Sequence, residues 1–196
     1  MRTKSLLLTL TFFFAHAALA GDLEDGRAAA KRGDHTTAFV KFRSAAQQGN
    51  DIAQTLVGMM YNEGKGVAQN YKEAVRWWLL AASQGNSTAQ YNLGDVYEEG
   101  KGVAQDYKEA VRWYRLAAQQ GHSNAQYNLG LMYGLGRGVL QDHTRAHMWF
   151  NIAAIAGDKG SVKNRDIAAS KMSPQQIEQA QHMARECMES NFTKCD

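Results

Sequence analysis

The chain contains little proline, little cysteine and little net charge. One proline and two cysteines occur in 196 residues. Since proline inside a helix removes a hydrogen bond and clashes with the preceding turn, its scarcity is compatible with an almost entirely helical protein. The 22 Lys and Arg residues nearly balance the 19 Asp and Glu residues. No long basic run is present, so the chain lacks the clustered phosphate contacts that nucleic-acid binding requires.

Long hydrophobic runs are also missing, except at the N-terminus. Arg2 and Lys4 precede an apolar stretch over residues 6–15, and Ala18-Leu19-Ala20 precedes Gly21. A basic segment, a short apolar core and a small-residue cleavage site are the layout of a secretory signal peptide. The alternative, a membrane anchor, needs about 17–25 apolar residues. We therefore predict a signal peptide over residues 1–20, cleaved after Ala20, and an exported mature chain without a membrane span.

The two cysteines, Cys187 and Cys195, lie close together near the C-terminus. In an exported protein such a pair predicts a disulfide, and two free thiols on the chain end are the alternative. No nearby His or Cys completes a four-ligand zinc set. We predict no metal site and no cofactor.

What the chain does contain is a repeated segment. Copies 36 residues apart begin at Ala53, Ala89 and Ala125. A fixed period of this length predicts a solenoid, in which each unit buries its apolar face against its neighbours. Solenoids mostly present binding surfaces, so the repeat limits function as well as fold.

The second copy has the pattern of two helices joined by a glycine-rich loop. Ala89, Leu93 and Tyr97 recur on one helical face, and residues 100–102 are a Gly-Lys-Gly turn. Asp106 begins a second helix that ends at Gly121, and Glu109 stands at the capping-box position.

Glycine and aromatic residues recur with the same period. Gly94 marks a place where a second helix can approach closely. The aromatic pairs at 77–78, 113–114 and 149–150 share a stripe with recurring alanines, which favours core packing over a ladder for stacking ligands.

The complete pattern is A-x-Y-x-L-G-x-x-Y-x-x-G-x-G-V-x-x-D-x-x-x-A-x-x-W-Y-x-x-A-A-x-x-G. It resembles the SEL-one-like repeat (SLR), a relative of the tetratricopeptide repeat. The resemblance covers residues 34–160 and implies an all-α fold, a right-handed α-α superhelix of helical hairpins. We expect an N-terminal capping repeat over 21–52, repeats over 53–88, 89–124 and 125–160, and C-terminal capping helices over 161–196.

Two pairs of residues are weak candidates for a catalytic or metal-binding site. Glu98 and Glu99 are adjacent, and neighbours on a helix point about 100° apart. His143 and His147 have a spacing that suits a metal on a helix, but no acidic third ligand stands nearby. We interpret the histidines as a surface pair or a pH-responsive spot.

The remaining candidates for function are the variable positions of the first helices. In tetratricopeptide repeats these helices line the concave face, and the resemblance places a peptide-binding groove there. The expected groove positions are Thr55, Leu56, Met59, Asn62 and Glu63 in the first copy, Tyr91, Asn92, Asp95, Glu98 and Glu99 in the second, and Tyr127, Asn128, Leu131 and Leu135 in the third.

The resemblance implies a non-catalytic scaffold that binds a protein or peptide in the bacterial periplasm or after secretion. Two alternatives stay open. One is a β-lactam or cell-wall hydrolase, as suggested for cysteine-rich relatives. The chain, however, has no S-x-x-K or K-T-G motif. The other is a secreted virulence factor that binds host proteins.

Overall fold

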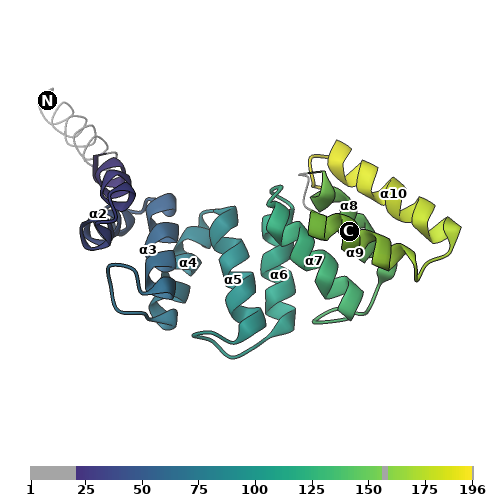
Figure 1. The fold of residues 1–196 in the computed structure, drawn as a ribbon, viewed down its shortest axis with the longest axis horizontal. Helices are drawn as coiled ribbons and strands as arrows, with labels where there is room; N and C mark the ends of the chain where they lie inside the picture. The colour runs from purple at the N-terminus through teal and green to yellow at the C-terminus, as the bar shows by residue number, and fades with distance from the viewer. Residues whose placement is uncertain (1–20, 156–158, 196) are drawn as a thin grey trace, which may run out of the picture. The chain divides into compact units, whose positions relative to one another are not determined.

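The computed structural model describes residues 21–155 and 159–195, and this part of the chain contains helices and no strand (Figure 1). The predicted signal peptide lies outside the described residues. The chain divides into two compact units, one up to Asn86 and one from Ser87 onward. No helix of the described part is long and apolar enough to cross a membrane.

The first unit consists of a helical segment followed by three helices. Residues 21–31 are helical, and they are followed by α2 (His35–Gln47), α3 (Asp51–Glu63) and α4 (Tyr71–Ser83). Leu23 and Ala29 of the N-terminal segment are buried with Phe39 and Phe42 of α2 and Val57 of α3. This segment therefore belongs to the core of the first unit.

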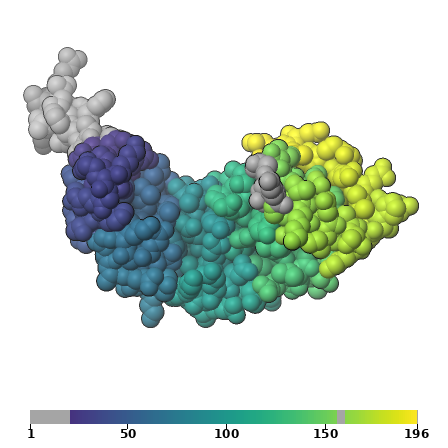
Figure 2. All heavy atoms as spheres, viewed as in Figure 1, coloured from purple at the N-terminus to yellow at the C-terminus, as the bar shows by residue number. Residues whose placement is uncertain are grey.

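The described residues of the second unit form six helices. They are α5 (Ser87–Glu99), α6 (Tyr107–Ala118), α7 (Ser123–Leu135), α8 (His143–Ala154), α9 (Lys159–Ala169) and α10 (Pro174–Glu189). α8 packs against α7, α9 and α10. In Figure 2 the yellow surface of α10 lies beside the green surface of α8 and α9. The last helix thus covers the third hairpin.

Glycines of the first helices give the aromatic rings of the second helices room to approach. Gly94 faces the ring of Tyr114, and a Cβ at Gly130 would lie 2.8 Å from Phe150 Cδ1. The close approach predicted at Gly94 is therefore confirmed. The predicted packing role of the aromatic pairs is confirmed as well, since five of the six rings are buried and the sixth is half-buried: Trp78, Trp113, Tyr114, Trp149 and Phe150, with Trp77 partly exposed.

Asp106 caps the start of α6 as predicted, but the expected capping box is incomplete. The Asp106 side chain accepts hydrogen bonds from the N–H groups of Lys108 and Glu109. A reciprocal bond from Glu109 is not formed, because the Asp106 N–H donates to the Tyr97 carbonyl and Glu109 pairs with Arg112. α10 has the complete capping box, made by the side chains of a Ser–Gln pair.

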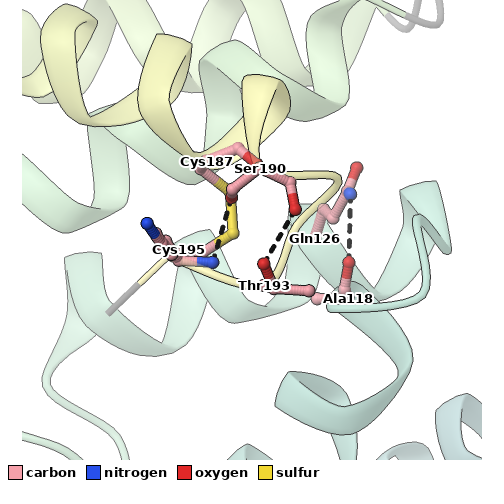
Figure 3. The surroundings of a disulfide bond; sticks show 7 residues. Ala118, Gln126, Cys187, Ser190, Thr193 and Cys195 are labelled. Atoms are coloured by element: carbon pink, nitrogen blue, oxygen red, sulfur yellow. Dashed lines mark hydrogen bonds between the residues drawn. A yellow bond between two sulfur atoms is a disulfide. The ribbon is translucent and has the colours of Figure 1, made fainter.

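The predicted disulfide between Cys187 and Cys195 is present, and both cysteines are buried (Figure 3). The turn that it closes is held by further hydrogen bonds, since the Phe192 N–H donates to the Cys187 carbonyl and the Lys194 N–H donates to Ser190 Oγ. The Phe192 ring packs beside Gly121, at the end of the second hairpin. The disulfide therefore fastens the C-terminal turn to the core of the second unit.

Buried glutamines join neighbouring helices, both within a hairpin and between successive hairpins, a feature that the repeat pattern alone does not predict. Gln126 Nε2 donates to the Ala118 carbonyl at 3.2 Å (Figure 3). Gln120 Nε2 donates to the buried Gln90 Oε1 at 2.7 Å. The recurrent Ala-Gln dipeptide at the start of each copy is the signal that could have revealed them.

Candidate functional site

The groove positions of the first copy lie on α3, and one of them is not exposed. Thr55 is only 5% exposed, so the expectation of an exposed side chain there is wrong. Its hydroxyl donates to the Asp51 carbonyl, and its own carbonyl accepts a hydrogen bond from the Trp78 indole. The equivalent residues of the other copies, Tyr91 and Tyr127, are larger and half-buried. Leu56 and Asn62 are half-buried, whereas Met59 and Glu63 are exposed.

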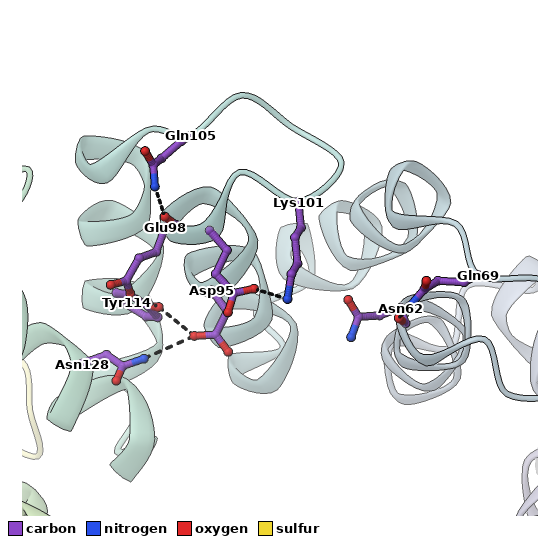
Figure 4. Close-up of polar contacts among 9 residues, drawn as sticks. Asn62, Gln69, Asp95, Glu98, Lys101, Gln105, Tyr114 and Asn128 are labelled. Atoms are coloured by element: carbon purple, nitrogen blue, oxygen red, sulfur yellow. Dashed lines mark hydrogen bonds and ion pairs between the residues drawn. The ribbon is translucent and has the colours of Figure 1, made fainter.

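In the second copy the predicted positions form a polar cluster around Tyr114 (Figure 4). The Tyr114 hydroxyl lies 2.7 Å from Asp95 Oδ1 and 2.9 Å from Glu98 Oε2. Asn128, from the next copy, donates to the same Asp95 oxygen at 3.2 Å. Arg137 lies 3.5 Å from Glu98 Oε1. Asp95 and Glu98 thus face one another across a shared hydroxyl group, in contrast to the adjacent Glu98 and Glu99.

The cluster lies in a partly desolvated setting. Burial raises the pKa of Asp95, against the opposing effect of hydrogen bonds from tyrosine hydroxyls. Burial, followed by the nearby Asp95 charge, also raises the pKa values of Tyr91 and Tyr114, so both phenols stay protonated at neutral pH. The Tyr91 ring stacks on His122 at a centroid distance of 4.7 Å.

These residues line an open cleft of about 480 Å³. Its walls combine carboxylates, phenols, two amides and one guanidinium from α5, α6, α7 and the loops that follow α5 and α7: Tyr91, Asp95, Glu98, Glu99, Gln105, Tyr107, Tyr114, Asn128 and Arg137. Asn92 is half-buried beside them on α5. The cleft offers hydrogen-bond acceptors and aromatic faces, which suit a polar or cationic group.

The repeat pattern predicts only a packing role for Tyr114 and gives no signal for Arg137. The signal for Tyr114 is its hydroxyl, since the other two copies have Trp78 and Phe150 at the equivalent position. Arg137 follows the glycine that ends α7, in a loop that the pattern explains only as a turn.

The third copy replaces the polar cluster with apolar side chains. Leu131 and Leu135 lie on α7, and Leu135 is 56% exposed. Tyr127 is half-buried, with its hydroxyl accepting a hydrogen bond from Asn164 of α9 at 2.9 Å. The predicted positions of the second and third copies therefore share the α5–α7 side of the second unit but have opposite polarity.

The two histidines of α8 do not form a surface pair. His147 is 3% exposed, and its Nδ1 atom is buried without a hydrogen-bond partner. Burial lowers its pKa, and the charge of Arg165 acts in the same direction. The expectation of a surface position is wrong because residue 147 occupies a core position, which Val111 fills in the second copy. His143 is half-buried.

With this geometry described, the chain can be compared with known proteins. The Sel1 repeat family model matches residues 51–86, 87–122 and 123–158, more than half of the chain. The matched stretches begin at the first residues of α3, α5 and α7. The protein belongs to the Sel1 repeat family, whose members commonly mediate protein–protein interactions.

Solved structures with the same fold include a protective antigen of uropathogenic Escherichia coli with an SLR fold. The two chains are 30% identical and superpose with a TM-score of 0.60. The match covers 80% of this chain and 42% of the antigen chain. A Sel1 repeat protein from Oxalobacter formigenes is 37% identical, with a TM-score of 0.60, over 65% of this chain and 96% of that protein. Cysteine rich protein B of Helicobacter pylori shares the fold at 19% identity, with a TM-score of 0.55, over 65% of this chain and 95% of that one. No curated protein matches the chain in sequence.

Proposed function

We propose that the protein is an exported, non-catalytic scaffold that binds a protein or peptide through the first-helix face of its repeats. The observation that carries this proposal is the variation on α5 and α7 over an almost constant core. Leu93 and Leu129 are equivalent and completely buried, whereas Asp95 and Leu131 are equivalent, partly exposed and chemically opposite. A face that binds a partner requires exposed positions that vary between repeats while the buried core stays the same.

Export is supported by two features besides the predicted signal peptide. A buried disulfide is typical of proteins outside the reducing cytosol. The similarity to the Escherichia coli protective antigen points in the same direction, because an antigen that protects is reached by the host. That similarity also favours a second candidate, a surface or secreted protein that contacts host proteins.

The proposal is tested by placing a photo-crosslinking residue at Asp95 or Leu131 in cells. The matched control is Arg112, which is exposed on the second helix α6. Capture of one defined partner from Asp95 or Leu131, and not from Arg112, is the expected result. Capture from Arg112 alone would place the interaction on the other helices and contradict the proposed face.

Catalysis and export are tested separately. The purified protein is expected to leave the β-lactam nitrocefin intact, and measurable turnover would disprove a purely scaffolding role. Export is tested by fractionation and N-terminal sequencing, with Gly21 as the expected first residue. A mature chain that retains residues 1–20 and stays in the cytosol would contradict export.

A further inference from the structure

Gly134 differs from the other helical glycines of the repeats. Gly94 and Gly130 each face an aromatic ring that would clash with a Cβ atom. A Cβ at Gly134 would meet only the Ala146 Cβ, at 3.6 Å, which is an ordinary van der Waals contact. Its backbone is not in the left-handed region either. Neither packing nor backbone geometry therefore requires glycine at this position, where the other copies have Asn62 and Glu98.

Gly134 lines a small pocket between α7, α8 and α9. The pocket has a volume of about 120 Å³, and its lining is largely apolar: Leu131, Gly134, Leu135, His143, Phe150, Asn164, Ile167, Ala168 and Lys171. Leu135 is 56% exposed and Ile167 is 46% exposed. Two aliphatic side chains from different helices thus remain partly exposed to water beside one pocket, which is unfavourable for apolar surface.

The residues that line this pocket carry charge of one sign. Lys171, which follows α9, lines the pocket with its ammonium group. None of the lining residues is acidic. This contrasts with the cleft of the second copy, which three carboxylates line. The pocket therefore complements an apolar group that stands next to a negative charge.

We propose that this pocket binds one aliphatic side chain of a partner polypeptide, with an acidic residue beside it in contact with Lys171. This inference rests on the proposed scaffold function and specifies the partner's chemistry at the third copy. The volume supports a single side chain, because an apolar cavity of about 150 Å³ accommodates one benzene molecule. A partner that places Leu or Ile here covers Leu135 and Ile167 at the same time.

The test uses methyl NMR on the purified full mature chain, with the Leu and Ile methyl groups labelled. The probe is a hexapeptide, GSLDSG, capped at both ends and titrated to millimolar concentration. Two matched peptides, GSSDSG and GSLKSG, lack the aliphatic side chain or reverse the charge. We expect GSLDSG to shift the methyl signals of Leu131, Leu135 and Ile167, GSSDSG to bind at least tenfold more weakly, and GSLKSG at least threefold more weakly.

Two variants test the pocket itself. G134L fills it and is expected to abolish the shifts, while circular dichroism and the melting temperature report that the fold persists. K171E reverses the charge beside the pocket. We expect this variant to bind GSLKSG more tightly than GSLDSG. The matched control is K163E on α9, because Lys163 is exposed and does not line the pocket. This control is expected to bind GSLDSG as the unchanged chain does, within twofold.

Several results would overturn the inference. These are absence of shifts with GSLDSG, equal binding of GSLKSG, or binding that persists in G134L. Concentration-dependent shifts of the same methyl groups without peptide would show that a second copy of the chain is the occupant. If a partner is crosslinked at Leu131 equally in the unchanged chain, G134L and K171E, the pocket inference fails while the scaffold function stands. If GSLDSG binds but no site captures a partner in cells, the scaffold function fails.

Discussion

The second and third copies place different chemistry on the same helical frame. Tyr114 in the second copy donates its hydroxyl hydrogen to carboxylates on α5, where Asp95 lies 2.7 Å away. In the third copy the equivalents are Phe150 and Leu131, so the hydroxyl group and the carboxylate are lost together. Glu98 is likewise replaced by Gly134. The difference is therefore a coordinated exchange of a polar set for an apolar one.

The comparison separates residues that form the frame from those that give it specificity. Leu93 and Leu129 are fully buried, and Gly94 and Gly130 each receive an aromatic ring. These residues tolerate little change because the interior is close-packed. The neighbouring exposed positions are free of that constraint, and on our proposal they are the ones that a partner contacts.

The largest expected effect concerns the disulfide at the end of α10, the helix that packs against the third copy. Replacing both cysteines in C187A/C195A is expected to reduce the free energy of unfolding by about 2–3 kcal/mol, because the unfolded chain loses a short covalent loop. Urea denaturation measures this loss. The unchanged chain in reducing buffer is the control and should show the same loss. An unchanged urea midpoint would mean that the C-terminal turn holds without the disulfide.

The glycines that face an aromatic ring and Gly134 are expected to respond with opposite signs when each is replaced by alanine. G94A and G130A place a Cβ against an aromatic ring and should destabilise the protein by about 1–3 kcal/mol. G134A meets no such obstacle and should stabilise it by about 0.4–1 kcal/mol, because alanine restricts the unfolded chain. Urea denaturation of the three variants tests both signs. Destabilisation by G134A would show a structural need for this glycine.

The coordinated exchange can be tested by a double-mutant cycle at Tyr114 and Asp95. Y114F alone is expected to cost about 1 kcal/mol, since partly buried carboxylates lose a hydrogen-bond donor. D95L/Y114F reproduces the residues of the third copy and should cost less than the two single variants together, with a coupling of about 0.5–1 kcal/mol. Additive losses in urea denaturation would mean that the two positions changed independently.

The smallest effect concerns the pH dependence of the third copy. The pKa of His147 is lowered by burial, so the folded protein binds fewer protons at this site than the unfolded chain does. Stability from this group is complete above the unfolded pKa, about 6.5, and decreases as the pH falls below that value. H147V introduces the residue of the second copy and should flatten this decrease.

Thermal unfolding between pH 7.5 and 5 measures the decrease. His182 lies exposed on α10, so H182V is the matched control and should retain the slope of the unchanged chain. The same slope in H147V would assign the acid sensitivity to other groups.

The helices, their caps and most of the core could be predicted from the repeat, because each of these features has a local signal. The Gly100-Lys101-Gly102 turn and the cysteine spacing are examples. The site was harder to predict, because exposure depends on which residue lies opposite. Thr55 is buried although the equivalent Tyr91 and Tyr127 are half-buried, and its carbonyl accepts a hydrogen bond from the Trp78 indole. The role of Tyr114 depends on an oxygen atom that the shared aromatic pattern does not distinguish.

The glutamine contacts have a consequence for how the gene could change in length. Gln84 donates to Gln54 at 2.8 Å, and Gln120 donates to Gln90 at 2.7 Å, always 30 residues apart. Duplication or loss of one 36-residue segment copies or removes both members of such a pair together. Unequal recombination in whole segments therefore keeps these pairs together, whereas an insertion or deletion of another size between the two glutamines would separate them.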